Sequence, residues 1–369
     1  MKAGPLAGVR VLEVGGIGPN PFAGMLLADM GADVLRLDRA VGAGIAQSGP
    51  ADPTLRGRQT LTVDLKSAAG HAAAVKLAER ADALIEGFRP GVMERLGLGP
   101  DQLLALNPRL VYGRMTGWGQ TGPLATAAGH DMNYMSVAGA LSLVRRAGER
   151  PTLPLNLVGD YGGGALFLAF GVVCAILESR TSGVGQVIDT AMVDGTALLT
   201  AFVHGLHASG QWSEEQGTNL LDSGAHFYEV YTTADDGYLA VGPIEPQFYA
   251  RFLELLEIPA FEMPQWERER WPEFKERLAA VFVGRPTAEW QALLEGEEVC
   301  VTVVRTPWEA PDHPHLTARG TFIELDGVRQ PGPAPRFSRT PGVARPAEQD
   351  PAAALARWGL DAADWPGLS

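Results

Sequence analysis

The chain has 369 residues, of which 46% are hydrophobic and 20% are charged, and its formal net charge is -13. This composition is typical of a globular protein with one large core or two moderate ones, and it excludes a chain that is disordered throughout. The negative charge argues against nonspecific nucleic-acid binding. Residues 1–120 nevertheless carry 13 Lys and Arg against 11 Asp and Glu. This part of the chain would attract an anionic ligand more than the rest, unless the difference in charge along the chain arises by chance.

The amino-terminal stretch and the longest apolar run indicate where in the cell the protein is expected to be. MKAGPLAGVRVLEV lacks the apolar segment of a secretory signal and is typical of a first strand. The apolar run at 165–177 is shorter than a membrane span and predicts a buried helix. Cys174 and Cys300 are too few for a disulfide framework or a metal quartet, so we expect both to be core thiols. These features predict a cytoplasmic protein with no membrane partner.

Short β-branched runs alternate with helical patterns over the first 200 residues. Such alternation predicts crossover connections and a mainly parallel sheet with helices on both faces. Ligands of these sheets bind in the loops beyond the carboxyl ends of the strands. The predicted strands are 9–14, 32–37, 59–65, 82–88, 109–115 and 186–192, and the predicted helices are 21–31, 67–81, 131–144, 163–180 and 194–207.

The pattern changes near residue 222. Residues 226–243 predict a hairpin with Asp235, Asp236 and Gly237 in its turn. Two or three acidic helices follow at 247–258, 272–283 and 288–296, and then a strand at 299–304. The proline-rich stretch 330–346 is expected to be an extended strap, and 352–365 a short helix pair. We therefore predict a large Rossmann-like domain at 1–221, a small α+β domain at 222–329, and a strap with helices at 330–369 that returns to the large domain.

A glycine turn separates the first predicted strand from the first helix in VLEVGGIGPNPFAG. Gly16-x-Gly18-x-x-Pro21 approaches a dinucleotide-binding fingerprint, but proline stands where a third small residue lets helix and strand come close. The fingerprint therefore fails, although proline early in a helix is tolerated. The turn either offers its backbone to a ligand or has a purely structural role.

Basic residues recur at the ends of the predicted strands and in the loops beyond them. The carboxyl ends of parallel strands meet at one edge of a sheet, so these side chains together could neutralise several phosphate charges. Each one alone could equally be a solvated surface charge. No GxxxxGKS or GxxxxGKT loop is present, so phosphates would be held and not transferred. The residues concerned are Arg36, Arg39, Arg58, Lys66, Arg89 and Arg95.

Acid/base candidates stand at the starts of three predicted helices. His130 and Asp131, in GHDMNY, follow a glycine-rich stretch, and Asp131 is well placed as an N-cap. Asp160, in NLVGDYGGG, precedes three glycines where helix N–H groups would hold a carboxylate ionised. Glu245 follows a predicted strand in GPIEPQ. Each residue is either a structural cap or a catalytic group. Three consecutive glycines weaken a helix, which favours a functional reason at Asp160.

Together, these stretches resemble the family III coenzyme A transferase (CaiB/BaiF) superfamily, and within it the α-methylacyl-CoA racemase branch. The resemblance implies an α/β fold with a large Rossmann-like domain and a smaller α+β domain, and an interlocked homodimer of two threaded chains. The stretches that carry it run in family order from residue 5 to 342: PLAGVRVLEV, GADVLRLDR, TVDLK, EGFRPGVMERLG, RMTGWGQTGP, GHDMNY, NLVGDYGGG, QVIDTAMVDG, DGYLAVGPIEPQFY and PAPRFSRTPG.

By similarity, His130 and Asp160 are the two acid/base residues, and Glu245 orients the histidine from the small domain of the partner chain. Transferases of the superfamily use the aspartate equivalent to Asp160 as an acyl-accepting nucleophile and usually lack the GHD histidine. The presence of His130 therefore favours the racemase branch. The resemblance also implies CoA contacts at Arg39, Val63, Asp64, Leu65, Lys66, Gly87, Phe88, Arg89, Arg95, Gly129, Asp131, Met132, Asn133 and Tyr134.

The implied reaction needs no metal or redox cofactor, since CoA is part of the acyl-CoA substrate. Inverting the α-carbon of a thioester requires one group to remove a proton from one face and another to deliver a proton to the other. Imidazole suits this exchange because it titrates near neutrality, and helix N–H groups beside Asp160 could stabilise the enolate. Met and Gly residues near the site would leave a smooth surface for the acyl chain. A CoA transferase and a non-enzymatic acyl-CoA binder are the alternatives.

Overall fold

The computed structural model describes residues 4–39 and 52–365. The chain divides into two compact units. Unit 1 consists of Met1–Ala138, Pro154–Leu199 and Pro314–Ser369, and unit 2 consists of Gly139–Leu153 and Thr200–His313. Each unit is therefore assembled from separate stretches of the chain.

Unit 1 contains a six-stranded parallel sheet with the spatial order β3-β2-β1-β4-β5-β6. This is the strand order of the doubly wound Rossmann fold, in which ligands bind where the order reverses, here between β1 and β4. All six predicted strands are present, and the predicted parallel sheet is confirmed. The strands are β1 (Arg10–Val14), β2 (Asp33–Asp38), β3 (Gln59–Thr62), β4 (Ala83–Glu86), β5 (Val111–Thr116) and β6 (Val187–Ala191).

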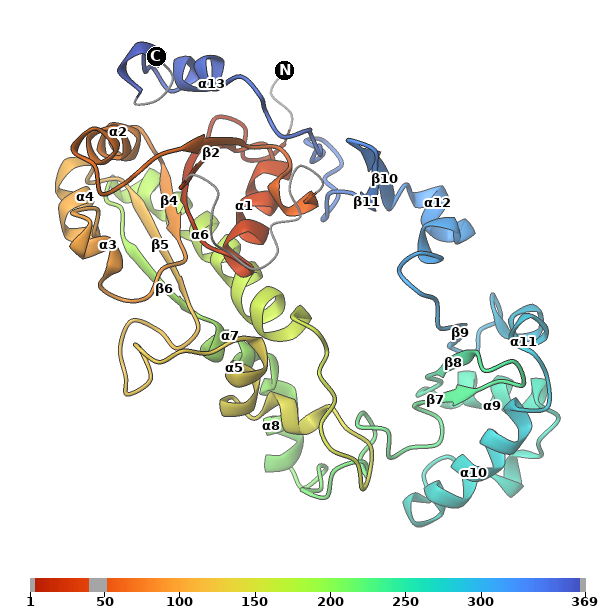
Figure 1. The fold of residues 1–369 in the computed structure, drawn as a ribbon. Helices are drawn as coiled ribbons and strands as arrows, with labels where there is room; N and C mark the ends of the chain where they lie inside the picture. The colour runs from red at the N-terminus through yellow and green to blue at the C-terminus, as the bar shows by residue number, and fades with distance from the viewer. Residues whose placement is uncertain (1–3, 40–51, 366–369) are drawn as a thin grey trace. The chain divides into compact units, whose positions relative to one another are not determined.

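Helices cover both faces of this sheet (Figure 1). One face packs against α2 (Ala68–Ala78), α3 (Val92–Arg95), α4 (Pro100–Leu106) and α13 (Pro351–Arg357), and the other against α1 (Pro19–Asp29) and α6 (Leu166–Ser182). Successive strand residues point to opposite faces. Leu12 and Leu35 accordingly enter the first core, whereas Val11 and Val34 enter the second. Two apolar cores thus fix the sheet on which the candidate site is built.

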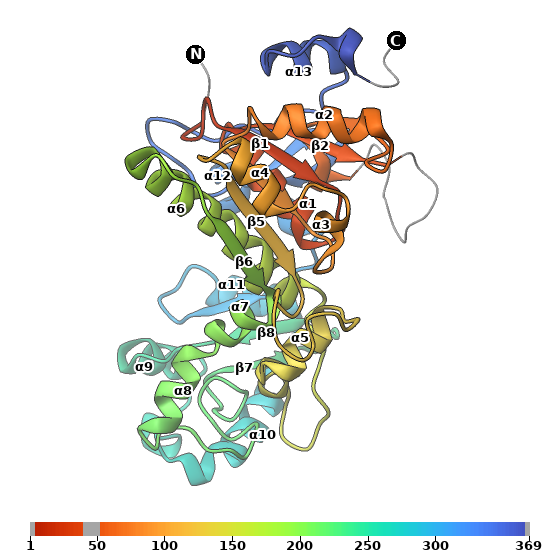
Figure 2. The same ribbon diagram turned by 90° about the vertical axis from the view of Figure 1, so that its left-hand side faces the viewer.

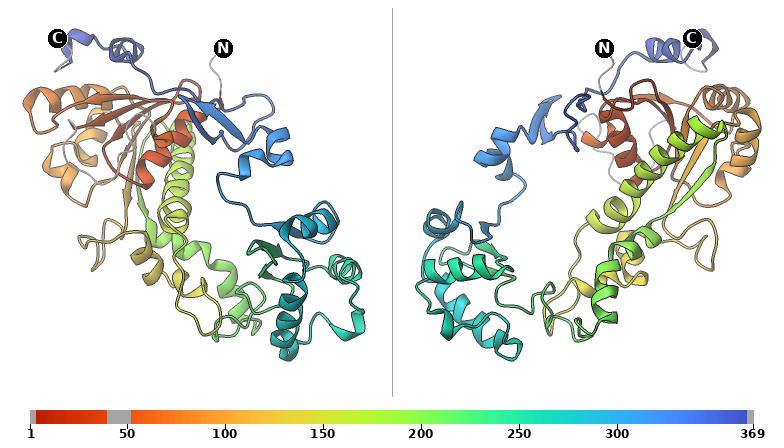
Figure 3. Two further views of the ribbon diagram at one scale, coloured as in Figure 1. Left: turned by 45° about the vertical axis from the view of Figure 1, so that its right-hand side comes forward. Right: turned by 180° about the vertical axis from the view of Figure 1, so that it is seen from behind.

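The carboxyl-terminal segment belongs to unit 1, with α12 (Pro314–Arg319) followed by an antiparallel pair, β10 (Phe322–Leu325) and β11 (Val328–Pro331), that the sequence patterns do not predict. Residues 332–350 form no helix and only one isolated bridge, as expected for a strap. The Val343 N–H donates to the Asp29 carbonyl at 2.9 Å, and the Glu348 N–H to the Arg58 carbonyl at 2.9 Å. Figure 3 shows this segment passing the red amino-terminal elements before it reaches α13.

Unit 2 contains a three-stranded antiparallel sheet of β7 (Glu229–Thr232), β8 (Tyr238–Val241) and β9 (Val301–Val303). The predicted hairpin turn is confirmed, with Asp236 in the left-handed region at φ +58°. An aromatic core joins the sheet to its helices. The helices of unit 2 are α8 (Ala201–Ala208), α9 (Pro246–Leu255), α10 (Trp271–Phe282) and α11 (Thr287–Leu294). Short 3-10 turns in the two units lie at Pro53–Leu55, Ala140–Leu143, Ala260–Glu262, Arg268–Arg270, Ala310–Asp312 and Ala362–Asp364.

Three predicted helices differ from the observed ones. The helix expected at 131–144 ends early as α5 (Asp131–Val137), because Gly139 adopts a left-handed φ of +82°. The helix expected at 194–207 is divided at Thr200 into α7 (Met192–Leu199) and α8. The helix expected at 163–180 begins earlier, as a π-helix over Leu157–Ala165 that runs directly into α6. π-Helical turns often occur at functional sites.

The apolar run at 165–177 is therefore part of a longer helical segment, Leu157–Ser182, and not a short buried helix. Among the described residues, this is the one helix that is long and apolar enough to cross a membrane. Core helices of soluble proteins also meet this criterion of length and composition, and 44% of the most apolar stretch of the helix is buried. Phe170 and Leu177 on it are each 69% exposed. Cys174 and Cys300 are both exposed, which corrects the prediction of core thiols. α6 packs on the sheet by one face only, and Cys174 lies on another.

Candidate active site

Glycines allow the loops after β1 and β4 to pack together at the carboxyl edge of the sheet. A Cβ on Gly15 would lie 2.7 Å from the Phe88 ring. Cβ atoms on Gly16 and Gly87 would lie 3.1 Å and 3.2 Å from the Asn20 side chain. Figure 2 shows that β5 and β6 run toward α5 and α7, which border the same edge. The switch point between β1 and β4 is therefore closely packed.

Asp160 reaches this edge from the π-helix. A Cβ on Gly18, at the end of the β1 turn, would lie 3.1 Å from Asp160 Oδ2. The Asp160 side chain also hydrogen-bonds Asn156, one helical turn earlier. Gly18 therefore lies beside Asp160, and the choice between a turn that offers its backbone to a ligand and a purely structural turn stays open. The expectation that a helix starts only after Asp160 is wrong, because the π-helix already begins at Leu157.

His130, and not Asp131, is the N-cap of α5. The His130 N–H donates to Asn133 Oδ1 at 3.0 Å, and the Asn133 N–H donates to the His130 carbonyl at 2.8 Å. Asp131 is the first helical residue and is 8% exposed. Its Oδ2 accepts the backbone N–H of Asp160 at 2.7 Å. The predicted capping role of Asp131 is therefore wrong, since its carboxylate bonds to a different helix.

The environment of Asp160 favours proton exchange. Burial, and next the negative charge of Asp131, raise the pKa of the Asp160 carboxyl to about 6. The hydrogen bond with Asn156 and the charge of His130 act in the opposite direction. A carboxyl that titrates close to neutrality can both take up and release a proton in the range where most enzymes work.

The Tyr134 side chain packs closely beside Trp118 and Gly129. Its hydroxyl donates to the Gly129 carbonyl, and its ring meets the edge of Trp118 at 4.9 Å between centroids. Cβ atoms on Gly117 and Gly129 would lie 2.1 Å and 2.8 Å from the Tyr134 ring. Burial, and then the charge of Asp160, raise the pKa of Tyr134 to about 12. The phenol therefore stays protonated at neutral pH.

The residues expected to contact CoA follow strands of the sheet. Arg39 comes directly after β2, the segment 63–66 after β3, and the segment 87–89 after β4, while Arg95 ends α3. Val63 is buried, and Leu65 and Phe88 are partly buried. Arg39, Asp64, Lys66, Arg89, Arg95, Met132 and Asn133 are exposed. The exposed cations follow successive strands, as predicted for an edge of the sheet that binds phosphates. Their contact with CoA stays a prediction.

Two of the basic residues at strand ends are not accessible to a ligand. Arg36 and Arg58 are 3% and 1% exposed, and both form ion pairs with the fully buried Glu13. Arg36 also pairs with Asp38 at 2.8 Å. Glu13 and Arg36 are register partners in β1 and β2. These arginines therefore tie the strands together and do not neutralise phosphates.

Glu86 is a supporting residue that sequence reasoning missed. It ends β4, and its Oε2 accepts the Phe88 N–H at 2.7 Å. Its Oε1 accepts from Arg114 Nε at 3.1 Å, and Arg114 also pairs with Glu94 at 2.8 Å. Burial raises the pKa of Glu86 to about 7 in spite of these bonds. An acidic residue directly after the apolar run ALI, at the end of the strand, is the signal that marks it.

Glu245 belongs to unit 2, where it is the exposed N-cap of α9. The Gly242 N–H, three residues earlier, donates to the Cys300 carbonyl at 2.9 Å. Burial, and then the charge of Glu245, raise the pKa of the Cys300 thiol. Across residues 4–39 and 52–365, no three His, Cys, Asp or Glu side chains are placed to hold a metal ion.

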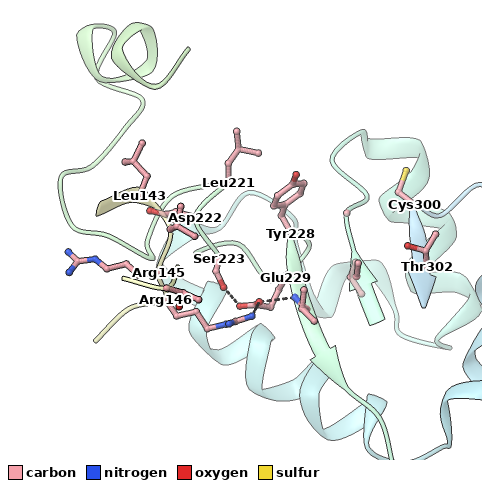
Figure 4. Close-up of a pocket in the computed structure, with 16 residues that line it drawn as sticks. Leu143, Arg145, Arg146, Leu221, Asp222, Ser223, Tyr228, Glu229, Cys300 and Thr302 are labelled. Atoms are coloured by element: carbon pink, nitrogen blue, oxygen red, sulfur yellow. Dashed lines mark hydrogen bonds and ion pairs between the residues drawn. The ribbon is translucent and has the colours of Figure 1, made fainter. Parts of the chain in front are cut away.

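A pocket of about 660 Å³ lies in unit 2 between β7, β8, β9 and the segment 143–152 (Figure 4). The largely buried Glu229 lies on its wall and pairs with Arg146 at 2.9 Å and with Lys275 at 2.9 Å. Burial alone would raise the pKa of Glu229, but hydrogen bonds from Ser223, the Val230 N–H and both cations lower it. None of the predicted site residues lines this pocket.

The parallel sheet with the Rossmann strand order makes this an α/β protein. Its candidate acid/base residues, His130 and Asp160, lie on helical segments that are joined by the hydrogen bond between Asp131 and the Asp160 N–H. The sequence model of CoA-transferase family III matches residues 6–353, and the chain belongs to this family. The predicted family is thereby confirmed.

Curated relatives include α-methylacyl-CoA racemases. The Mus musculus enzyme is 46% identical over 349 residues, which are 94% of this chain and 90% of that protein. The Homo sapiens enzyme is 42% identical over 341 residues, which are 92% of this chain and 88% of that protein. A solved structure of Mycobacterium tuberculosis Rv3272 has a TM-score of 0.76 and 27% identity, and the match covers 94% of this chain and 98% of that one. Rv3272 is described as a probable fatty acyl-CoA transferase.

Proposed function

We propose that this protein is an α-methylacyl-CoA racemase that interconverts (2R)- and (2S)-2-methylacyl-CoA thioesters. His130 and Asp160 act as its two acid/base residues. The observation that carries the proposal is the placement of Asp160, with a pKa of about 6, against the glycine turn of β1 and next to the start of α5, where His130 is the N-cap. The identity of 46% and 42% with racemases over most of the chain supports the same reaction.

The reaction moves one proton at the α-carbon. The unprotonated member of the pair removes the α-proton, and the electron pair of the C–H bond passes to the thioester carbonyl oxygen to give an enolate. The protonated member then delivers its proton to the opposite face, and the carbonyl re-forms. The Asp160 N–H already donates to Asp131, so it does not stabilise the enolate. The N–H groups of Asp131 and Met132, the first two residues of α5, are the proposed donors.

The CoA part is held by the strand-end loops that carry Arg39, Lys66, Arg89 and Arg95. Their guanidinium and ammonium groups suit phosphate oxygens. The backbone of Val63–Lys66, Gly87–Arg89 and Gly129–Tyr134 completes the proposed contacts. No further cofactor is required, and the proposed setting is the cytoplasm, without nucleic-acid or membrane partners.

A second copy of the chain completes the proposed site, in an interlocked homodimer that brings Glu245 to His130. Support comes from apolar residues of α6 and α7 that are more than half exposed, because extensive exposed apolar surface often marks a protein–protein contact. These residues are Leu166, Phe170, Leu177, Leu198 and Leu199.

A CoA transferase is the second candidate, favoured by the structural match to a probable fatty acyl-CoA transferase. In that reaction Asp160 would attack the thioester as a nucleophile and pass CoA to a free acid. A carboxyl with a pKa of about 6 suits proton exchange, and once ionised it can also act as a nucleophile, so the pKa alone does not separate the two candidates.

Incubation of a 2-methylacyl-CoA with the protein in D2O separates the candidates. A racemase incorporates deuterium at the α-carbon with no added acid. A transferase moves CoA to an added carboxylic acid and incorporates none, and a non-enzymatic binder does neither. CoA transfer without α-exchange would exclude the racemase.

A further inference from the structure

The Asp131 carboxylate lies between α5 and the π-helix, inside the protein. Its Oδ2 accepts the Asp160 N–H at 2.7 Å. Its Oδ1 is buried and has no hydrogen-bond partner among the residues that the structure describes. A buried carboxylate with an unsatisfied oxygen lowers stability. Stability therefore does not account for a charged residue here, and a functional reason is needed.

The backbone beside Asp160 is built around this carboxylate. A Cβ on Gly159 would lie 2.6 Å from Asp131 Oδ2 and 2.8 Å from its Cγ. Gly159 is buried, so a side chain there could not turn away into solvent. The glycine before Asp160 thus gives room to the Asp131 carboxylate.

We propose that Asp131 is a positioning residue for Asp160: its buried carboxylate fixes the Asp160 backbone and places a second negative charge beside the Asp160 side chain. This inference rests on the proposed function, in which Asp160 exchanges a proton. The like charge favours the protonated form of Asp160 and makes it a stronger base when it is ionised. Asp131 therefore directs Asp160 toward proton transfer.

The other charged groups near Asp160 do not supply this effect. His130 acts in the opposite direction. Tyr134 is uncharged at neutral pH, and Arg89 is a cation. The acidic residue of α7, Asp194, is exposed. On the neighbouring strands, Arg114 pairs with Glu86 and Glu94, and the Asp189 carboxylate accepts the Gln120 N–H.

The test is the titration of the Asp160 carboxyl by 13C NMR in protein labelled at aspartate carboxyl carbons, with the resonance assigned through Asp160→Asn. Asp131→Asn keeps an oxygen that can accept the Asp160 N–H but removes the charge. We expect this variant to lower the titration midpoint of Asp160 by about one pH unit. Asp101→Asn, which removes an exposed carboxylate from α4, leaves the midpoint unchanged. An unchanged midpoint in Asp131→Asn would overturn the inference whether or not the protein is a racemase.

Kinetics separate positioning from CoA contact. In Asp131→Asn the acid limb of the pH profile of kcat should move to lower pH with the titration midpoint, while KM for the acyl-CoA stays the same. Asp131→Ala also removes the hydrogen bond, so kcat should fall at least tenfold below that of Asp131→Asn. A rise in KM with kcat and its pH profile unchanged would make Asp131 a substrate contact and contradict the inference.

Discussion

Gly18 has no side chain because Asp160 lies against it. An added Cβ would stand 3.1 Å from Asp160 Oδ2, and the φ of Gly18 is +64°. We expect Gly18→Ala to lower kcat/KM about tenfold, because displacing an acid/base group by a fraction of an ångström disturbs proton transfer. The measurement is the initial rate of racemisation by chiral analysis of the acyl product.

Gly8→Ala is the matched control for this substitution. Gly8 also has a positive φ, of +92°, but its Cβ would have no heavy atom within 4 Å. Backbone strain is therefore common to both variants, and only Gly18→Ala adds the contact with Asp160. Equal losses of activity in the two variants would mean that backbone strain, and not contact with Asp160, is the reason why a glycine is needed at position 18.

The sequence identified the candidate acid/base residues but not their contacts. His130, Asp160 and Glu245 are recognisable because they stand in glycine- or proline-bounded motifs. Arg36 and Arg58 looked equally suited to phosphate, yet they pair with Glu13. Which cation meets a buried carboxylate depends on strand register, here Glu13 opposite Arg36, and register is not visible in a single sequence.

At the scale of elements, α6 covers the sheet with one face and leaves an apolar face exposed. Phe170 on that face is 69% exposed. If a second chain covers it, Phe170→Glu would bury a charge in the interface, which is strongly unfavourable. We expect the parent protein to sediment as a dimer and Phe170→Glu to sediment as a monomer or to aggregate.

Leu106→Glu provides the control for the α6 variant, because Leu106 is 52% exposed at the end of α4. It should leave the sedimentation coefficient unchanged. A parent protein that is monomeric at micromolar concentration would contradict the proposed homodimer, and a dimer unaffected by Phe170→Glu would place the interface elsewhere.

The start of the central apolar helix could not be predicted because two tendencies compete there. Three glycines after Asp160 weaken a helix, so its start was expected within them, at residue 163. In the structure Gly163 and Gly195 are closely packed, and a Cβ on Gly195 would lie 1.9 Å from the Gly163 carbonyl oxygen. Close approach of α7 therefore stabilises helical backbone where local propensity opposes it. Asn156, which bonds Asp160 one turn later, was missed for the same reason.

At the scale of the whole molecule, the raised pKa of Asp160 has a cost in stability. An unfolded Asp titrates near pH 3.9, whereas folded Asp160 titrates at about 6. The folded state therefore binds more protons between these values, and stability falls as pH rises through this window. Asp160→Asn should stabilise the protein above pH 6 by about 1 kcal/mol, after allowance for partial solvent screening.

Thermal unfolding at two pH values measures this effect. At pH 7.5 we expect the Tm of Asp160→Asn to exceed that of the parent by about 2 °C, and below pH 4 the gain should vanish because both side chains are then neutral. The exposed-site variant Asp101→Asn controls for the change in net charge. A gain that is the same at both pH values would show that it does not come from the ionisation of Asp160.

The proton-transfer roles of His130 and Asp160 are tested most directly by α-exchange of each separate enantiomer of a 2-methylacyl-CoA in D2O, followed by NMR and chiral analysis. The parent protein should invert both enantiomers with α-deuterium incorporation and no added acid. His130→Ala and Asp160→Asn should each lose inversion, and each should retain exchange of one enantiomer only, a different one in the two variants. Inversion at the parent rate by either variant, or CoA transfer without α-exchange by the parent, would contradict the assignment.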